Sequence, residues 1–406
     1  MNMATDEAGN AKDLFDEDTL FTALSENDNE TFHSLINACQ DINIRGPEGN
    51  HLLHVSVANG NLEITKHLID IGSDVNAKNE NHNTPLHLSV ERNDSEMTQY
   101  LLENGADANI GDKSNMTALH RAVRKNNAEI SQHLIDNGAD VNVLTEKRES
   151  ALHTAALKNY PDMARLLVEK GADLETLNLE GFTSIQIAAE CCHFEIVEYL
   201  LEKGADRRDI DKLGHTALHW AAKNGAAEVI QTLLQHGAEV NSMDMLYGDR
   251  PLHKASYEGH ADVVRALIKA GANKESVNHD GHRAVHDAAA KGHLEVIKIL
   301  LEEGADKNVL NAHGESPLIQ AAEFGHADVV KVLLDAGADR HLPNDYGVYP
   351  ICQIARRYND YVVEHQGNTS EATFSMLKTL FYFLEAGSYV NTETKETLCK
   401  LQNIAK

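Results

Sequence analysis

Histidine is the residue type whose number and spacing first suggest chemistry, because the sequence contains 23 histidines and imidazole is a common metal ligand. Seven of them end short segments of similar sequence: His54, His87, His120, His153, His219, His253 and His286. Most successive members are 33 residues apart, which places each one in a separate repeat. Stacked helical layers lie about 8–10 Å apart, whereas zinc ligands lie about 2 Å from the ion. These histidines are therefore not expected to share a metal.

A second candidate metal site is Cys191-Cys192-His193, where three possible ligands are consecutive. Adjacent side chains on a helix point in different directions, and no second pair of ligands follows in the sequence. Free cysteine usually behaves as a small buried hydrophobic residue, so we expect packing rather than ligation. The sequence also lacks the motifs of phosphate loops, nucleophile elbows and zinc proteases. We therefore expect no metal, no cofactor and no enzymatic activity.

The elements that must position these histidines form a repeat that covers most of the chain. Gln186, Ile319 and Cys352 take the place of the histidine in three further repeats. A second marker, Gly-Ala followed by an acidic residue or asparagine, keeps the same phase from Gly105 to Gly337. Two markers in phase over most of the chain indicate a repeat architecture.

Residues 211–243 show what one repeat must look like. Asp-Lys-Leu-Gly is a turn signal, and the Thr216 hydroxyl can cap a helix. Small apolar residues then indicate a short first helix that ends at Asn224-Gly225, and apolar residues at helical spacing indicate a second helix over 226–236. Such a unit can bury its apolar face only by stacking on its neighbours.

This period and pattern resemble those of the ankyrin-repeat family over roughly residues 46–391. The resemblance implies an all-α repeat solenoid, in which helix-turn-helix units with β-hairpin fingers stack into a curved array. It implies that fingers and first helices form the concave face, and that histidines such as His219 brace neighbouring fingers. Three fingertips have His82, Asn115 and Arg148 in place of the family's turn glycine, so we expect those tips to be strained or differently shaped.

The repeats predict one elongated domain with irregular ends. In chain order, the expected segments are a disordered acidic N-terminus (1–13), a capping half-repeat (14–45), nine regular repeats (46–343), an atypical tenth repeat (344–391) with an insertion at about 362–372, and a C-terminal capping helix (392–406). The insertion is either a functional loop or the ordinary irregularity of a terminal repeat.

Charge and cysteine usage limit the class of partner and the compartment. A net charge of −27 argues against nucleic acid or an anionic membrane as the main partner. No stretch approaches the ~20 apolar residues that cross a bilayer, and the N-terminus lacks the apolar core of a secretory signal. The five cysteines form no disulfide framework. These features favour the cytoplasm, or the nucleus, over an oxidising compartment.

A first candidate partner-binding patch lies in the repeats that begin at residues 211, 244 and 278, where one marker interval lengthens to 34 residues. Its candidate contact residues are Leu213, His215, Met245, Leu246, Tyr247, Tyr257, Glu258, His279, Asp280 and His282. Apolar and aromatic residues at fingertips are typical of a protein-binding hot spot. The alternative is that Leu246 and Tyr247 fold back over an adjacent finger and fill space made by the extra residue.

A second candidate patch is basic and consists of Arg121, Arg124 and Lys125, with further cations at Lys113, Lys147, Arg148 and Lys158. In so acidic a chain, this patch could receive an acidic peptide through charge-assisted hydrogen bonds. The alternative is internal pairing with Glu91, Glu146 or Glu149.

Three asparagines, Asn76, Asn142 and Asn241, resemble ankyrin-repeat sites that an oxygen-dependent asparaginyl hydroxylase modifies in animals. Asparagine is also simply a favourable residue in this turn. Hydroxylation therefore stays one of two interpretations of these positions.

The sequence thus predicts a monomeric, non-catalytic scaffold or adaptor that binds partner proteins through its finger and first-helix surface. Two other readings stay open. The chain is alternatively a structural or self-associating elastic element, or a secreted microbial effector that mimics host ankyrin proteins.

Overall fold

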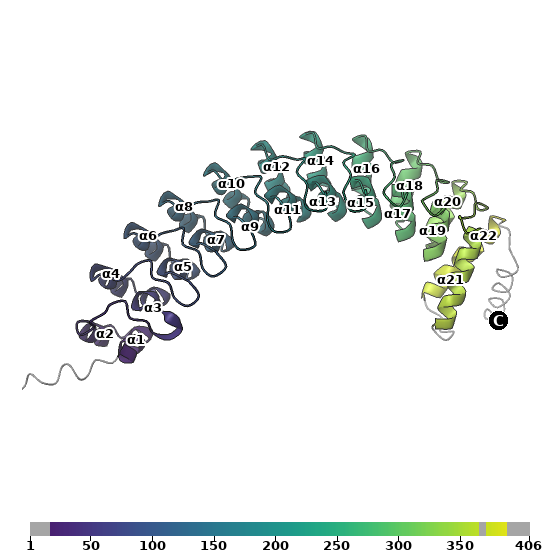
Figure 1. Ribbon diagram of the computed structural model, residues 1–406. Helices are drawn as coiled ribbons and strands as arrows, with labels where there is room; N and C mark the ends of the chain where they lie inside the picture. Colours follow the sequence, from purple (N-terminus) through teal and green to yellow (C-terminus); the bar gives the residue numbers. More distant parts are fainter. Residues whose placement is uncertain (1–16, 365–370, 388–406) are drawn as a thin grey trace, which may run out of the picture. The chain divides into compact units, whose positions relative to one another are not determined.

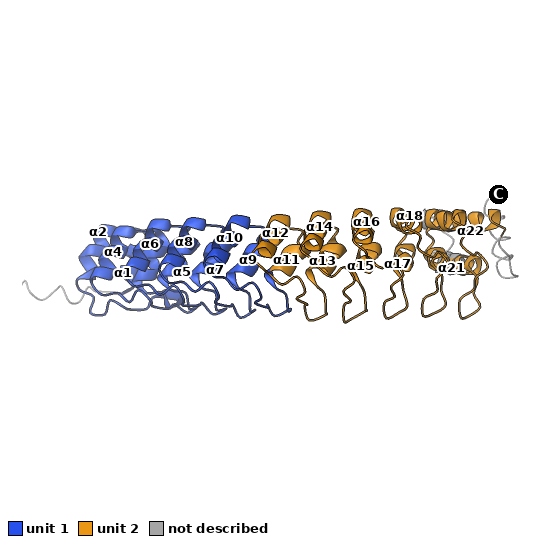
Figure 2. Ribbon diagram, turned by 90° about the horizontal axis from the view of Figure 1, so that it is seen from above, with its two compact units in different colours: residues 1–184 blue, residues 185–406 orange. Residues whose placement is uncertain are grey.

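The computed structural model describes residues 17–364 and 371–387. The expected N-terminal segment 1–13, the expected C-terminal helix 392–406 and the middle of the expected insertion lie outside the described residues. The chain divides into two compact units, Met1–Ser184 and Ile185–Lys406, rather than the single elongated domain that we expected (Figure 2). A repeat packs mainly against its sequence neighbours, so contacts do not spread over the whole chain.

Unit 1 consists of helix pairs in two rows, which we call inner and outer helices (Figure 1). The inner helices are α1 (Glu17–Ser25), α3 (Leu52–Asn59), α5 (Pro85–Glu91), α7 (Ala118–Arg124) and α9 (Ala151–Lys158). The outer helices are α2 (Asn29–Ile36), α4 (Leu62–Asp70), α6 (Ser95–Glu103), α8 (Ala128–Asp136) and α10 (Pro161–Glu169), and a short 3-10 helix, η1 (Pro47–Gly49), lies before α3.

Unit 2 repeats the same arrangement, and its boundary falls at the start of α11. The inner helices are α11 (Ser184–Glu190), α13 (Ala217–Asn224), α15 (Pro251–Glu258), α17 (Ala284–Lys291), α19 (Pro317–Phe324) and α21 (Pro350–Glu364). The outer helices are α12 (Phe194–Glu202), α14 (Ala227–Gln235), α16 (Ala261–Lys269), α18 (Leu294–Glu302), α20 (Ala327–Asp335) and α22 (Glu371–Glu385).

Side-chain size explains why the inner helices stack closely. In α13, Ala221 and Ala222 are fully buried, and α13 packs on α15 as α15 packs on α17. The outer helices contribute larger side chains, such as Leu233 of α14, which is also fully buried. Burying one such branched side chain stabilises the fold by about 1.5–3 kcal/mol. The core is thus continuous along each unit but thin across it.

The recurring histidines hold each repeat to the finger of the next. The Thr216 backbone N–H donates to Nδ1 of His219 at 3.1 Å, and the Thr216 hydroxyl lies 2.9 Å from the same nitrogen. Because Nδ1 accepts, Nε2 carries the proton and donates to the Asp249 carbonyl at 3.2 Å. The bracing that the resemblance implied is therefore present, and the histidine ring caps α13 where we expected the Thr216 hydroxyl to do so.

The fingers are turns that project beyond the inner helices, as Figure 2 shows. Among the described residues, the one β pairing is an isolated bridge between Arg45 and His51, so the implied β-hairpins are absent from them. In the finger of 211–243, the Asp211 N–H donates to the His215 carbonyl at 3.0 Å. The Asp211 carboxylate also accepts from the backbone N–H groups of Leu213 and His215. A side chain thus supplies bonds that a longer strand ladder would otherwise make.

The fingertips without glycine adopt the strained backbone that we expected. His82, Asn115 and Arg148 have φ values of 59°, 56° and 57°. This left-handed region costs a residue with a Cβ atom about 1–2 kcal/mol. The tips therefore keep the shape of the glycine tips, and the strain is the cost of the missing glycine.

The last repeat differs from the others in helix length. Helices α21 and α22 have 15 residues each, whereas the other inner and outer helices have seven to nine. Part of the expected insertion thus extends both helices, because α21 continues to Glu364 and α22 begins at Glu371.

Candidate functional site

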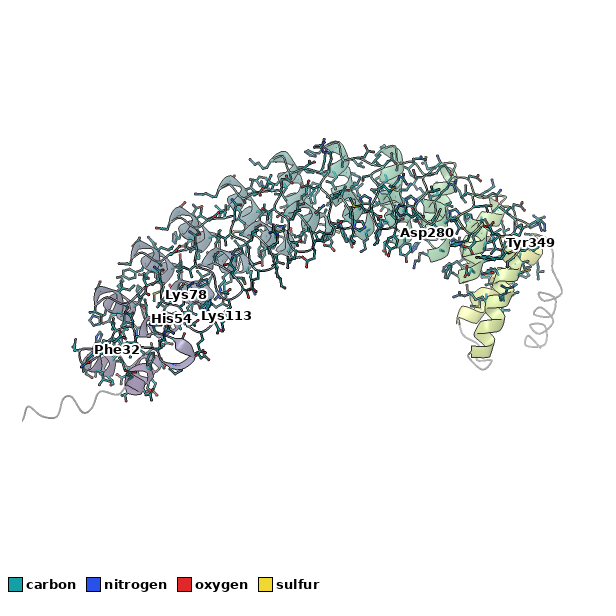
Figure 3. All side chains as sticks on the ribbon, viewed as in Figure 1. Phe32, His54, Lys78, Lys113, Asp280 and Tyr349 are labelled. Carbon is teal, nitrogen blue, oxygen red and sulfur yellow. The ribbon has the colours of Figure 1, made fainter. Side chains whose placement is uncertain are left out.

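A groove of about 560 Å³ lies in unit 2 between the fingers and the inner helices of the repeats that begin at 211, 244 and 278. We call it the aromatic groove. Its fingers contribute Leu213, His215, Leu246, Tyr247, Asp249, Asn278, Asp280 and His282. Its inner helices contribute His219, Trp220, Lys223, Lys254, Tyr257, Glu258 and Asp287. Asp280 is labelled in Figure 3.

The extra residue of the 244–277 repeat shapes the finger that overhangs this groove. The turn closes through the Asp244 N–H and the Asp249 carbonyl at 2.8 Å, one residue further along than in the neighbouring finger. Leu246 and Tyr247 are 48% and 52% exposed. The extra residue therefore presents these two side chains to solvent, and they do not fold back to fill space.

A buried polar network supports the groove from below. The two ring nitrogens of His215 face the carboxylates of Asp211, at 3.2 Å, and of Asp244, at 3.3 Å. The Trp220 indole N–H donates to the same Asp211 carboxylate at 3.1 Å. The Lys254 ammonium lies 2.9 Å from Asp244, whose side chain is fully buried. Because each charged group faces an opposite or polar partner, the network fixes the positions of the Trp220 and Lys254 side chains.

Electrostatics keep the members of this network ionised. Burial opposes the charge of Asp244, but Lys254 and the Tyr247 backbone N–H hold the pKa of Asp244 below its ordinary value. Burial likewise opposes the charge of Lys254, yet the carboxylates of Asp249 and Asp244 raise the pKa of Lys254. Lysine and aspartate are therefore both charged at neutral pH. They act as structural ions rather than as an acid and a base.

Three aromatic rings of the region each have a lysine ammonium over one face. Lys223 lies 4.9 Å from the centre of the Trp220 ring, and Lys254 lies 5.5 Å from that of Tyr247. Beyond the groove lining, Lys291 lies 4.2 Å from the ring of Tyr257. Such contacts contribute roughly 0.5–1 kcal/mol at exposed sites, and they help to hold the rings in place.

A second polar pair forms the far end of the groove. The His282 Nδ1 lies 3.2 Å from the Asp287 carboxylate, and Asn311 lies 3.1 Å from His282 Nε2. Burial alone raises the pKa of Asp287. Burial also disfavours the charged form of His282, but the bond to Asp287 outweighs it and raises the pKa of His282.

The structure brings most residues of the first candidate patch together. Leu213, His215, Leu246, Tyr247, Tyr257, Glu258, Asp280 and His282 line the groove, whereas Met245 and His279 are exposed outside its lining. His215 is mostly buried, so its ring serves the network more than a partner.

Sequence reasoning missed several lining residues, including Trp220, Lys223, Lys254 and Asp287. A signal for them was present. Each lies one or four positions after a marker histidine, which is the part of the inner helix that faces the fingers.

The second candidate patch is largely neutralised within unit 1. The Arg121 guanidinium lies 2.6 Å from the Asp112 carboxylate, also bonds Asn83, and is 14% exposed. Lys125 pairs with Glu91 at 3.0 Å. Internal pairing therefore explains these two cations, although Asp112 and not Glu146 or Glu149 is the partner of Arg121. Arg124 is exposed and contacts the sulfur of Met116 at 3.7 Å.

The three asparagines proposed for hydroxylation lie at equivalent turns and bridge neighbouring repeats. The Asn142 amide donates to the Gly171 carbonyl at 3.1 Å and accepts from the Asp173 N–H at 2.8 Å. Asn76 and Asn241 make the corresponding pairs of bonds. These bonds account for asparagine at the three positions, and modification stays a prediction.

The remaining chemical candidates lie apart from the groove. Cys192 adopts a φ of 61° in the turn between α11 and α12, and its thiol lies 3.7 Å from the Asn224 carbonyl oxygen. Within the described ranges, no three His, Cys, Asp or Glu side chains are grouped so that they could hold a metal ion. No helix in the same ranges has the length and apolarity needed to traverse a lipid bilayer.

A family model described as ankyrin repeats in three copies matches the chain in overlapping stretches. These are residues 20–112, 53–145, 91–178, 119–211, 152–244, 204–278 and 252–345. A search of curated proteins found no significant match.

Proposed function

Because this chain belongs to the ankyrin-repeat family, we propose that it is an adaptor that docks a partner protein in the aromatic groove of unit 2. Ankyrin repeats generally mediate protein–protein interaction and are typically non-catalytic. The observation that carries the proposal is the finger lengthened by one residue, which holds Leu246 and Tyr247 about half exposed over a groove lined by Trp220 and Tyr257. Exposed aromatic anchors beside a pocket are typical of binding hot spots.

The shape and charge of the groove favour an apolar side chain of the partner as its occupant. The aromatic rings supply the apolar area, and the buried network holds Trp220 in one orientation before binding. Such preorganisation lowers the entropy cost of association. Lys223, Glu258 and Asp280 are exposed at the edges, where they can select polar groups of the partner.

A photo-crosslinking residue at position 246 tests this proposal in cells, with the same residue at position 310 as the control. Leu310 is also an exposed apolar residue of unit 2, but it does not line the groove. We expect a protein to be crosslinked from position 246 and not from position 310.

The crosslinked protein is then purified and titrated by calorimetry against the full chain. The double variant Leu246→Asp/Tyr247→Asp is expected to bind at least about tenfold more weakly, as for loss of a hot spot. Leu310→Asp is expected to bind as wild type does. Equal affinity of the wild type and the double variant would place the docking surface elsewhere.

Light scattering of the purified chain separates an adaptor from a self-associating element. We expect a single mass equal to one chain across the concentration range. A mass that rises with concentration would favour self-association instead.

A further inference from the structure

A second hollow, of about 360 Å³, lies in unit 1 between the fingers of the repeats that begin at 112 and 145 and the helices α7 and α9. We call it the basic hollow. Arg124 and Lys158, which end these two helices, lie on one side of it, and Lys147 lies on the fingertip side. Met116 and Leu157 supply apolar surface between them.

The cations of this hollow differ from their neighbours in having no carboxylate partner. Arg121 and Lys125 pair with Asp112 and Glu91. For Arg124, Lys147 and Lys158, by contrast, the described part of the chain offers no carboxylate oxygen within ion-pairing distance.

The local charge is opposite to that of the whole chain. The acidic side chains that line the hollow are Glu146 and Glu149, against Arg124, Lys147 and Lys158. Lys113 and Arg148 are exposed on the same two fingertips and add to the positive side. The complete chain carries a net charge of −27, so this excess of cations is a local feature.

The apolar surface limits what kind of anion fits. Leu157 is 50% exposed, and the Arg124 guanidinium lies against the Met116 sulfur. A bare anion leaves this surface in contact with water, whereas an aliphatic side chain covers it. A long polyanion would also meet the surrounding negative charge of the chain.

We propose that the basic hollow binds a short acidic segment of a partner protein. One aliphatic side chain of the segment covers Leu157, and flanking carboxylates pair with Arg124, Lys147 and Lys158. The two fingers are joined tip to tip by the Glu146 N–H and the Ser114 carbonyl at 2.9 Å. Repeats lie about 8–10 Å apart, so crossing the two fingers takes about three extended residues at ~3.3 Å each. The proposal stands independently of the aromatic groove, which lies in the other unit.

Fluorescence polarisation with the full chain tests the proposal. The probe is a fluorescein-labelled peptide in which one leucine is flanked on each side by two glutamates. We expect it to bind the wild type, to bind more weakly as salt rises from about 50 to about 500 mM, and to bind better than two matched peptides. One of these has glutamines for the glutamates, and the other has alanine for the leucine.

Variants of the chain locate the site. Arg124→Glu and Lys158→Glu are each expected to weaken binding by at least about tenfold. Lys66→Glu makes the same charge change on the outer helix α4 and is expected to bind as the wild type does. The Leu246→Asp/Tyr247→Asp variant is also expected to bind the peptide normally, so a failure of one proposal is distinguishable from a failure of the other.

Three results would overturn the proposal. The first is equal binding of the glutamate and glutamine peptides. The second is equal weakening by Lys66→Glu and Lys158→Glu, which would show only a long-range effect of charge. The third is equal binding of the leucine and alanine peptides, together with displacement by inorganic phosphate, which would indicate a simple anion site.

Discussion

The basic hollow of unit 1 and the aromatic groove of unit 2 are built at the same positions of the repeat, yet they differ in chemistry. The position after the marker histidine is Arg121 in one repeat of unit 1, where Asp112 neutralises it. The same position in unit 2 holds Trp220 and Lys254. The helices and histidine bonds are alike in both units. The difference teaches that the repeat dictates the backbone and leaves this row of side chains free.

The fingers show a second difference between the two regions. The turn of the 244–277 repeat holds one more residue, yet the marker bonds on both sides survive it. His219 reaches the Asp249 carbonyl at 3.2 Å, and His120 of unit 1 reaches the Glu149 carbonyl at 3.3 Å. A fingertip therefore absorbs an added residue without disturbing the frame, and the added length appears as exposed side chains.

The largest expected effect compares the two aspartates at the base of these fingers. Asp244→Ala leaves the ammonium of Lys254 and the ring of His215 without their buried carboxylate, so we expect a loss of about 3–5 kcal/mol in unfolding free energy. Asp112→Ala leaves Arg121 bonded to Asn83, and we expect a loss of about 1–3 kcal/mol. Urea denaturation followed by circular dichroism measures both. Equal losses would show that the two networks do not differ.

The next effect concerns pH. Burial lowers the pKa of His219 to about 4, whereas its ordinary value is 6.5. Above 6.5 the histidine is neutral in both states. As pH falls from 6.5 towards 4, the unfolded chain takes up the proton first, so each such histidine lowers stability by about 1.4 kcal/mol per pH unit.

His87 of unit 1 has a pKa lowered to about 4 in the same way, so both units are expected to lose stability in this window. His219→Gln, which copies the natural Gln186, should flatten the decline in unit 2. The emission of Trp220, the single tryptophan, follows unfolding there. An unchanged slope would contradict the assignment of a neutral, buried His219.

A smaller effect separates the fingertips with glycine from those without it. A Cβ atom at Gly214, which has a φ of 83°, would lie 2.6 Å from the Met245 backbone nitrogen. Gly214→Ala is therefore expected to cost about 1–3 kcal/mol. His82→Gly relieves the left-handed strain but frees the unfolded chain, so we expect a gain of less than about 1 kcal/mol. Thermal melts of the two variants measure both changes, and a stable Gly214→Ala variant would be the contrary result.

The smallest expected effect is on stability at the exposed groove residues. Leu246→Asp/Tyr247→Asp should change the unfolding free energy by no more than about 0.5 kcal/mol, as is usual at the surface. Lys158→Glu should behave similarly in unit 1. Urea denaturation of each variant measures the change. A large loss in the double variant would mean that Leu246 and Tyr247 pack as structural residues after all.

The sequence was sufficient to predict the repeat frame, because each part of the frame depends on residues that recur. The markers around His219, the turn glycines and the alternation of small and large apolar residues together predicted the helix pairs, and the family match confirmed them. The β-hairpins were wrong in detail, since a single turn residue such as Asp211 supplies the bonds of a longer ladder.

The candidate sites were only partly predictable, because side-chain pairing depends on contacts between repeats. The extra residue drew attention to Leu246 and Tyr247. It gave no sign that Asp211 would hold Trp220 or that Asp112 would neutralise Arg121, since each pair is nine residues apart across a turn and a helix. Aligning the repeats and comparing the positions one, four and five residues after each marker would have found most of the lining residues.

The bonds between fingertips have a mechanical consequence for both surfaces. Neighbouring tips are tied by backbone bonds such as Met245 N–H to the Leu213 carbonyl at 2.9 Å and His279 N–H to the Tyr247 carbonyl at 2.8 Å. One such bond contributes about 1 kcal/mol, far less than the buried helix faces beneath it. The finger row is therefore the compliant part of the molecule and the helix rows are the stiff part. A bulky partner can spread two fingers at small energetic cost, so the choice of partner depends more on side-chain chemistry than on the resting width of the gap.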